Sequence, residues 1–269
     1  MEIHAHILIF MWALDSYFAS AACSLIILIV IPSGPSSSGK SHLTKKILEN
    51  AAKMMVPPPI ECIFNYSCWQ DLYEQIDTPF PIRFVEGISK FEDLPKDRQP
   101  RILIIDDSMD EVANSPDVAN MYTKYSHHYN YSVIVLTQNM FAKGKYFRTI
   151  SLNTHYLWLL KSIRDNSTIK TLGTQMGQRK FLFDCYTDAM KTNYGHLFIN
   201  LRPSADDNTR VRTKMFDSPS IVYVKKWLYY HVNFLANFRQ RNNNYLLAKF
   251  GKMGQSFFEA LSCLQFCLR

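Results

Sequence analysis

Eight consecutive residues near the start of the chain have the types and spacing of a loop that holds phosphate. They fit the pattern GxxxxGK[ST] and are Gly34, Pro35, Ser36, Ser37, Ser38, Gly39, Lys40 and Ser41. Glycines allow a tight turn with inward-pointing amides, and a following helix presents its positive end to the β- and γ-phosphates of a nucleotide. Lys40 would add a positive charge on those phosphates, and Ser41 a hydroxyl ligand for Mg²⁺. We therefore predict ATP binding by these residues, with a Ser/Gly-rich linker as the alternative.

Two acids end a second apolar run and supply the further group that a Mg²⁺-bound triphosphate needs. Residues 102–105 read Ile-Leu-Ile-Ile and are followed by Asp106 and Asp107. We expect Asp106 to hold the metal and Asp107 to polarise the attacking water as the general base. The alternative is that Asp107 and Ser108 only cap a helix or start a turn.

A third apolar run, over 132–137, ends in the amides Gln138 and Asn139. In an open α/β sheet, a polar side chain at the carboxyl end of a strand lies on the edge where ligands bind. We therefore expect Gln138 to sense the γ-phosphate or to orient water. An amide satisfied within its own turn is the alternative.

The segment 139–180 is strongly basic, with eight Lys and Arg residues against one acid, Asp165. Such density favours phosphate contacts, either with DNA or with the nucleotide of a neighbouring subunit. Arg148 and Arg164 are the candidates for an arginine finger, because a planar guanidinium suits a transferring phosphoryl group. A solvated basic surface is the alternative.

The elements that position these residues follow from apolar runs and helical patterns. Seven Leu, Ile and Val residues over 25–31 predict a buried parallel strand directly before the phosphate loop, and residues 40–54 predict a helix after it. Further strands are expected at 60–66, 82–85, 102–106, 132–137, 155–161, 196–201 and 211–216, and helices at 69–75, 118–128, 167–176 and 182–190. The alternation of strands and helices predicts an α/β fold with a mostly parallel sheet flanked by helices.

Composition and charge limit the classes of protein to which the chain can belong. The chain has 269 residues, 47% of them hydrophobic and 20% charged, with a net charge of +7. This is enough for a full-size α/β domain and excludes disorder, collagen-like repeats and a disulfide mini-scaffold. The six cysteines contain no CxxC pair, so neither a zinc ribbon nor a disulfide framework is indicated, and a reducing compartment fits best.

We divide the chain into an apolar extension (1–24), an ATPase core (25–216) and a basic, aromatic-rich appendage (217–269). Residues 5–31 are strongly apolar but are interrupted, and their cleanest stretch is shorter than the ~20 residues that a membrane span needs. A membrane anchor is therefore the alternative to a buried strand over 25–31, and we expect no membrane partner.

In this order along the chain, the motifs resemble those of the genome-packaging ATPases of the FtsK/HerA superfamily. The pieces are the phosphate loop, Ile104-Ile105-Asp106-Asp107, Leu136-Thr137-Gln138-Asn139, the segment from Arg148 to Asn153, and Ser162-Ile163-Arg164-Asp165. The resemblance covers roughly residues 26–216. It is greatest to the type found in poxvirus-like large DNA viruses, in Maverick/Polinton elements and in adintoviruses.

The resemblance implies a RecA-like core in which an additional strand separates the acid-pair strand from the phosphate-loop strand. It implies a ring of identical subunits, ATP hydrolysis at their interfaces, and translocation of double-stranded DNA into a capsid whose protein is a further partner. By position it assigns nucleotide and Mg²⁺ to Lys40 and Ser41, the metal to Asp106, water to Asp107 and a sensor role to Gln138. The finger falls to Arg148 or Arg164. The implied location is intracellular, in the nucleus, a cytoplasmic virus factory or the virion.

Other functions remain open at this point. A small-molecule kinase carries the same phosphate loop, but an acid pair followed by a strand ending in Gln138 favours hydrolysis over transfer. An inactive copy of the packaging ATPase in a host genome would keep the motifs. A non-catalytic nucleotide-dependent protein would be expected to have lost Lys40 or Asp107, and both are present.

Overall fold

The computed structural model describes residues 6–9, 28–31, 38–106, 109–141, 143–163, 165–217 and 220–225. The strands in these ranges are β1 (His6–Ile9), β2 (Leu28–Ile31), β3 (Glu61–Tyr66), β4 (Ile82–Glu86), β5 (Arg101–Asp106), β6 (Tyr131–Leu136), β7 (Tyr156–Leu160), β8 (His196–Asn200), β9 (Val211–Thr213) and β10 (Ile221–Val224). The helices are α2 (Lys40–Met54), the 3₁₀ helices η1 (Asp71–Gln75) and η2 (Phe91–Asp93), α3 (Met109–Asn114), α4 (Pro116–Asn120), the π-helical turn η3 (Met121–Tyr125), α5 (Ser126–Tyr129), α6 (Phe147–Leu152), α7 (Ser167–Gln175) and α8 (Arg179–Ala189).

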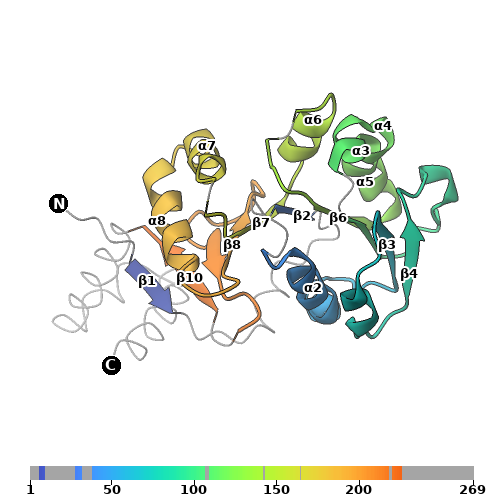
Figure 1. The fold of residues 1–269 in the computed structure, drawn as a ribbon, viewed down its shortest axis with the longest axis horizontal. Coiled ribbons are helices and arrows are strands. Elements are labelled where there is room, and N and C mark those ends of the chain that lie inside the picture. Colours follow the sequence, from blue (N-terminus) through green and yellow to red (C-terminus); the bar gives the residue numbers. More distant parts are fainter. Residues whose placement is uncertain are drawn as a thin grey trace, which may run out of the picture.

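All strands of the described residues form one sheet, in the order β1-β10-β9-β8-β7-β2-β6-β5-β3-β4 (Figure 1). The neighbours from β7 to β4 pair in parallel, whereas β8, β9, β10 and β1 pair antiparallel. β6 lies between β2, which precedes the phosphate loop, and β5, which ends in Asp106. The expected α/β fold with an additional strand between these two is therefore confirmed.

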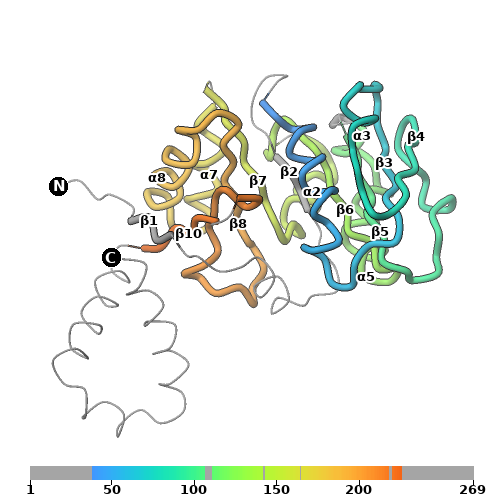
Figure 2. Tube along the Cα trace, turned by 90° about the horizontal axis from the view of Figure 1, so that it is seen from below, coloured from blue at the N-terminus to red at the C-terminus, as the bar shows by residue number. Residues whose placement is uncertain are grey.

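Helices cover both faces of the sheet, as Figures 1 and 2 show. On one face α2 and η1 share a hydrophobic cluster with Ile102, Ile104 and Ile134, and on the other α3 to α8 belong to a cluster that includes Leu103 and Val133. Successive residues of a strand point to opposite faces, so the middle of a strand covered on both sides is apolar at every position. β5 is buried throughout, and its four central residues are accordingly Ile-Leu-Ile-Ile.

Most expected elements are present, with shifted ends. The helix over 40–54 has the expected bounds, the strand expected over 211–216 ends at Thr213, and the helix expected from Leu182 begins at Arg179. α3 and α6 were not expected. Each has six residues, which is too short for a helical apolar period to be recognised.

The sheet extends beyond both boundaries expected for the ATPase core. β10 pairs with β9, and β1 pairs with β10 with His6 opposite Val224. The division at 24 and 216 stays a prediction, and most residues outside it lie beyond those that the structure describes. Within the described ranges, no helix has the length and apolar character needed to cross a membrane.

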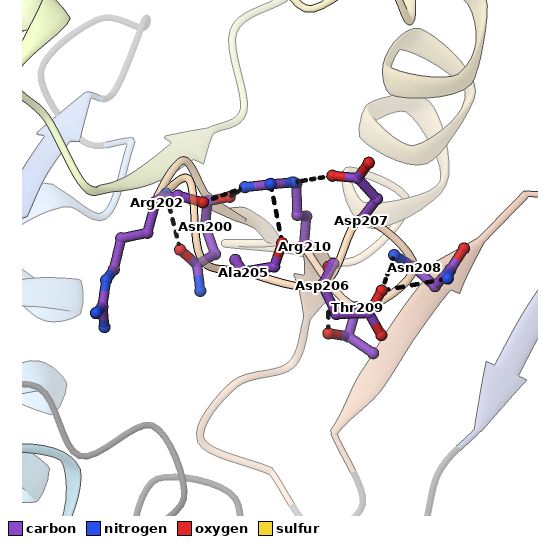
Figure 3. A network of polar contacts seen from close by, with 8 residues as sticks. All are labelled: Asn200, Arg202, Ala205, Asp206, Asp207, Asn208, Thr209 and Arg210. Carbon is purple, nitrogen blue, oxygen red and sulfur yellow. Dashed lines mark hydrogen bonds and ion pairs between the residues drawn. The ribbon is translucent and has the colours of Figure 1, made fainter. Parts of the chain in front are cut away.

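One guanidinium holds the connection between β8 and β9 (Figure 3). Nη1 of Arg210 donates to the carbonyl oxygens of Asn200 (2.9 Å) and Arg202 (2.7 Å), and Nη2 donates to that of Ala205 (2.9 Å). Nε of Arg210 also contacts Asp207 at 2.6 Å. The carbonyl of Arg202 also accepts from the amide of Ala205 at 3.1 Å. The guanidinium therefore joins the end of β8 to the loop that leads to β9.

A buried amide connects three segments close to the end of β5. Asn65 is 1% exposed, and its Nδ2 donates to the carbonyl of Ile104 at 2.9 Å. Its Oδ1 accepts from the amide and the hydroxyl of Ser89. Asn65 therefore ties β3 to β5 two residues before Asp106, and to the loop after β4.

Replacing Asn65 with alanine should lower the free energy of unfolding by about 2 kcal/mol, because it leaves buried partners unpaired. Urea denaturation measures this loss. Asn50→Ala is the matched control, since it removes an amide-to-carbonyl bond on the exposed part of α2. The control should cost about 0.5 kcal/mol or less. Equal losses in the two variants would contradict the structural role of Asn65.

The first residue of β8 makes stability depend on pH. Nε2 of His196 accepts from the amide of Met215 at 3.2 Å, and burial, followed by the charge of Lys46, lowers the pKa of His196 from 6.5 to about 4. The unfolded chain therefore binds a proton at pH values where the folded chain does not. The stability contributed by neutral His196 is fully present above pH 6.5 and is lost as the pH falls from 6.5 to about 4.

We therefore expect the urea midpoint to fall between pH 6.5 and 4, and to fall less in His196→Gln. Part of the dependence should remain, since burial also lowers the pKa of His155. The exposed His128 provides the control, and His128→Gln should keep the full dependence. An unchanged dependence in His196→Gln would refute the assignment.

Candidate active site

The carboxyl ends of the parallel strands meet at one edge of the sheet, where the candidate residues follow them. Val30 in β2 lies opposite Leu136, the last residue of β6, and Ile105 in β5 lies opposite Val135. The phosphate loop, Gln138 and Asp106 therefore follow three adjacent strands at the same edge. Ligands of open α/β sheets bind at such an edge.

The described part of the phosphate loop runs from Ser38 to Ser41. Gly39 is the N-cap of α2 with φ 94°, a left-handed conformation that glycine adopts without strain. Gly39 has no side chain to cap the first turn and no acid lies in it, so among the described residues its amide groups are available to an anion. The residues Gly34, Pro35, Ser36 and Ser37 lie outside the described residues.

The side chains around this helix end fit a nucleotide phosphate. The Oγ of Ser38 is buried and has no hydrogen-bond partner among the described residues. In the same part of the chain, no carboxylate forms an ion pair with Lys40. A buried hydroxyl, uncapped amides and an ammonium group together form a set of donors suited to a polyanion.

The two expected metal ligands have partners in the segment that follows β3. Asp106 is 2% exposed, and its Oδ2 accepts from the hydroxyl of Tyr73 at 2.9 Å. The Oγ of Ser41 donates to Oε1 of Gln70 at 2.7 Å. A serine hydroxyl and a carboxylate are oxygen donors of the kind that Mg²⁺ prefers, so the residues present fit this ion.

Sequence reasoning did not single out Gln70 or Tyr73. A signal for them exists, since the strand expected over 60–66 ends at the same edge as the strand expected over 102–106. The register places Tyr66 directly opposite Asp106. Polar residues that follow such a strand are candidates for contact with the acid at the end of its neighbour.

Gln138 is exposed at the end of β6, and its turn is held by other residues. The amide of Asn139 donates to Oγ1 of Thr137 at 3.3 Å, and Oδ1 of Asn139 accepts from the amide of Phe141 at 2.8 Å. No hydrogen bond joins the Gln138 side chain to another described residue. Its amide is therefore available to a ligand, as the sensor role requires.

The remaining candidates are placed only in part. Arg148 is exposed on α6, in the connection from β6 to β7. Asp107 and Arg164 lie outside the described residues. The role of Asp107 as general base and the choice between the two arginines therefore stay predictions.

A tyrosine that the sequence analysis did not consider lies against the phosphate loop. Leu160 pairs with His196, so the loop before β8 reaches the edge where β7 ends. In this loop Tyr194 is 71% exposed. Its Cδ1 lies 3.1 Å from the position that a Cβ on Gly39 would take. Its ring is nearly parallel to that of His42, with centroids 6.5 Å apart.

Gly39→Ala should destabilise the fold for two reasons, the positive φ and the contact with Tyr194. The first costs about 1–2 kcal/mol for an L-residue. Gly87→Ala is the matched control, because Gly87 also has a positive φ (78°) but has nothing within 4 Å of an added Cβ. Urea denaturation should show a larger loss for Gly39→Ala, and the excess should disappear in a Tyr194→Ala background. An excess that persists there would exclude Tyr194 as its cause.

No protein-family model matches the chain, and no curated protein matches it. Solved structures with a similar fold include the genome packaging NTPase B204 from Sulfolobus turreted icosahedral virus 2 in complex with ATP-gammaS. The two chains share 13% identity over 74% of this chain and 97% of that one, with a TM-score of 0.43. The same protein in complex with sulfate shares 12% identity over 70% of this chain and 95% of that one, with a TM-score of 0.46. B204, the DNA-packaging ATPase from Sulfolobus Turreted Icosahedral Virus, shares 13% identity over 64% of this chain and 92% of that one, with a TM-score of 0.41.

Proposed function

We propose that this chain hydrolyses ATP at the carboxyl edge of its parallel sheet. The observation that carries the proposal is the strand order at this edge. β6 separates β2, which leads to the phosphate loop, from β5, which ends in the buried Asp106. Strands two positions apart are separated by about 10 Å. This spacing suits a triphosphate that is bound at α2 and reaches toward Asp106.

The residues of the chain divide the chemistry among them. Amide groups of the first turn of α2, with Ser38 and Lys40, bind the phosphates. Ser41 and Asp106 would hold Mg²⁺, which neutralises charge on the β- and γ-phosphate oxygens when it is bound. Asp107 accepts a proton from the water that attacks the γ-phosphorus, and the bond from that phosphorus to the bridging oxygen breaks. Gln138, which is exposed after the strand between β2 and β5, orients that water or contacts the γ-phosphate.

The finer proposal is that hydrolysis drives double-stranded DNA into a capsid. The basic residues described within 139–180 are all exposed: Lys143, Lys145, Arg148, Lys161, Lys170, Arg179 and Lys180. Lysine and arginine side chains in this number bind DNA through its phosphates and without sequence preference. A translocating motor needs binding of this kind.

Translocation also calls for several subunits, and we propose a homo-oligomeric ring with ATP at its interfaces. Ile163, which precedes Arg164, is 84% exposed, and a neighbouring subunit in such a ring would cover it. Arg148 or Arg164 would then reach the neighbour's ATP. On the ordered motifs, we assign the chain to the type of poxvirus-like viruses, Polintons and adintoviruses. We also propose a capsid-protein partner and a location in the nucleus, a virus factory or the virion.

The test is ATP hydrolysis by the full chain, with and without double-stranded DNA. We expect DNA to raise the rate, Lys40→Ala to lower it at least about 100-fold and Asp107→Asn by a similar factor. Lys53→Ala, at the exposed end of the same helix, should leave it unchanged. Transfer of phosphate to a nucleoside monophosphate, with no effect of DNA on the rate, would show that the chain is a kinase and would contradict the proposal. ATP binding without turnover would indicate an inactive copy.

A further inference from the structure

One short segment contacts both residues assigned to the Mg²⁺ site. It comprises residues 69–73, from Trp69 to Tyr73, and follows β3. Gln70 accepts a hydrogen bond from Ser41 (2.7 Å), and Tyr73 donates one to Asp106 (2.9 Å). Ser41 lies 29 positions from Gln70 in the chain, and Asp106 lies 33 positions from Tyr73. The segment thus joins two parts of the chain that carry the site.

The chemistry of each hydrogen bond suits a cation ligand. A serine hydroxyl has one proton and two lone pairs, so a proton donated to Oε1 of Gln70 leaves the lone pairs of Ser41 for a metal. The hydroxyl of Tyr73 donates to a carboxylate oxygen of Asp106 and so restricts the orientation of the carboxylate. Partners that orient metal ligands in this way typically change metal affinity 10–100-fold when they are removed.

Aromatic packing holds the segment in place. Tyr73 is 3% exposed, and its ring centroid lies 4.7 Å from that of Phe64 and 5.8 Å from that of Phe84. Trp69 packs edge-on against Tyr73 (5.5 Å) and Phe84 (5.1 Å). Because large rings anchor both of its ends, the segment can present Gln70 and Tyr73 at fixed positions.

We propose that residues 69–73 are a positioning element for the divalent cation that accompanies the nucleotide. Gln70 orients the hydroxyl of Ser41, and Tyr73 orients the carboxylate of Asp106. The inference rests on the proposed ATP-binding function and adds two residues to it. It predicts that changes in Gln70 and Tyr73 alter metal affinity and leave metal-free nucleotide binding intact, which a merely structural role would not do.

The experiment titrates Mn²⁺ into the full chain at a fixed, saturating ADP concentration and follows free Mn²⁺ by electron paramagnetic resonance. Gln70→Ala and Tyr73→Phe should each raise the dissociation constant for Mn²⁺ about tenfold or more. ADP binding in EDTA, measured by calorimetry, should change less than about twofold. Gln70→Glu keeps an acceptor for Ser41 and should bind Mn²⁺ more tightly than Gln70→Ala.

Two variants serve as matched controls. Gln75→Ala changes an exposed amide of the same 3₁₀ helix, and Tyr66→Phe removes a hydroxyl from the same aromatic cluster. Both should keep the wild-type Mn²⁺ affinity. In a Ser41→Ala background, Gln70→Ala should have no further effect, because the residue that it orients is gone.

The possible outcomes distinguish failure of the positioning element from failure of the proposed ATP-binding function. A wild-type chain that binds no ADP in either condition would overturn the proposed function. A wild-type chain that binds Mn²⁺ with ADP, together with Gln70→Ala and Tyr73→Phe variants that bind it equally well, would overturn the positioning element alone. Variants that lose as much affinity for metal-free ADP as for Mn²⁺ would show a structural role and would also overturn the positioning element.

Discussion

A parallel strand that is buried on both faces can bring polar groups to a ligand only where it ends. β5 and β7 are buried at every position, so the candidate residues lie at a strand end, as Asp106 does, or in the segments that leave the sheet. The insertion of β6 sets the distance between the phosphate loop and Asp106. The placement of Gln138, of the helix end of α2 and of the basic connection through α6 all follow from this order.

The walls of the site come from parts of the chain that a motif search does not connect. The segment after β3 reaches Ser41 and Asp106, and the loop before β8 brings Tyr194 against Gly39. Register explains both contacts. Tyr66 is opposite Asp106 at one side of the parallel sheet, and Leu160 is opposite His196 at the other. β8 runs antiparallel to β7, so it begins at the edge where β7 ends. The loop before β8 therefore lies at the same edge as the loops that follow the parallel strands.

Local features of the sequence were sufficient for the central part of the fold. Runs of apolar residues predicted β5, β6 and β7, and the phosphate loop predicted the start of α2. α3 and α6 were missed because one and a half turns of helix carry too little periodicity. Gln70, Tyr73 and Tyr194 were missed for another reason. Their contacts depend on which strands pair. The shared edge of the strands over 60–66 and 102–106 is a signal for Gln70 and Tyr73, but composition and spacing near each residue do not give the strand order.

The pairing of β1 with β10 has a consequence for the order in which the chain folds. Residues 6–9 leave the ribosome long before their partners, residues 221–224. The segments around the phosphate loop, β5 and β8 are complete by residue 200. Domains begin to fold during synthesis, and contacts of large sequence separation form late. The carboxyl edge of the parallel strands can therefore form before β10 is synthesised and pairs with β1.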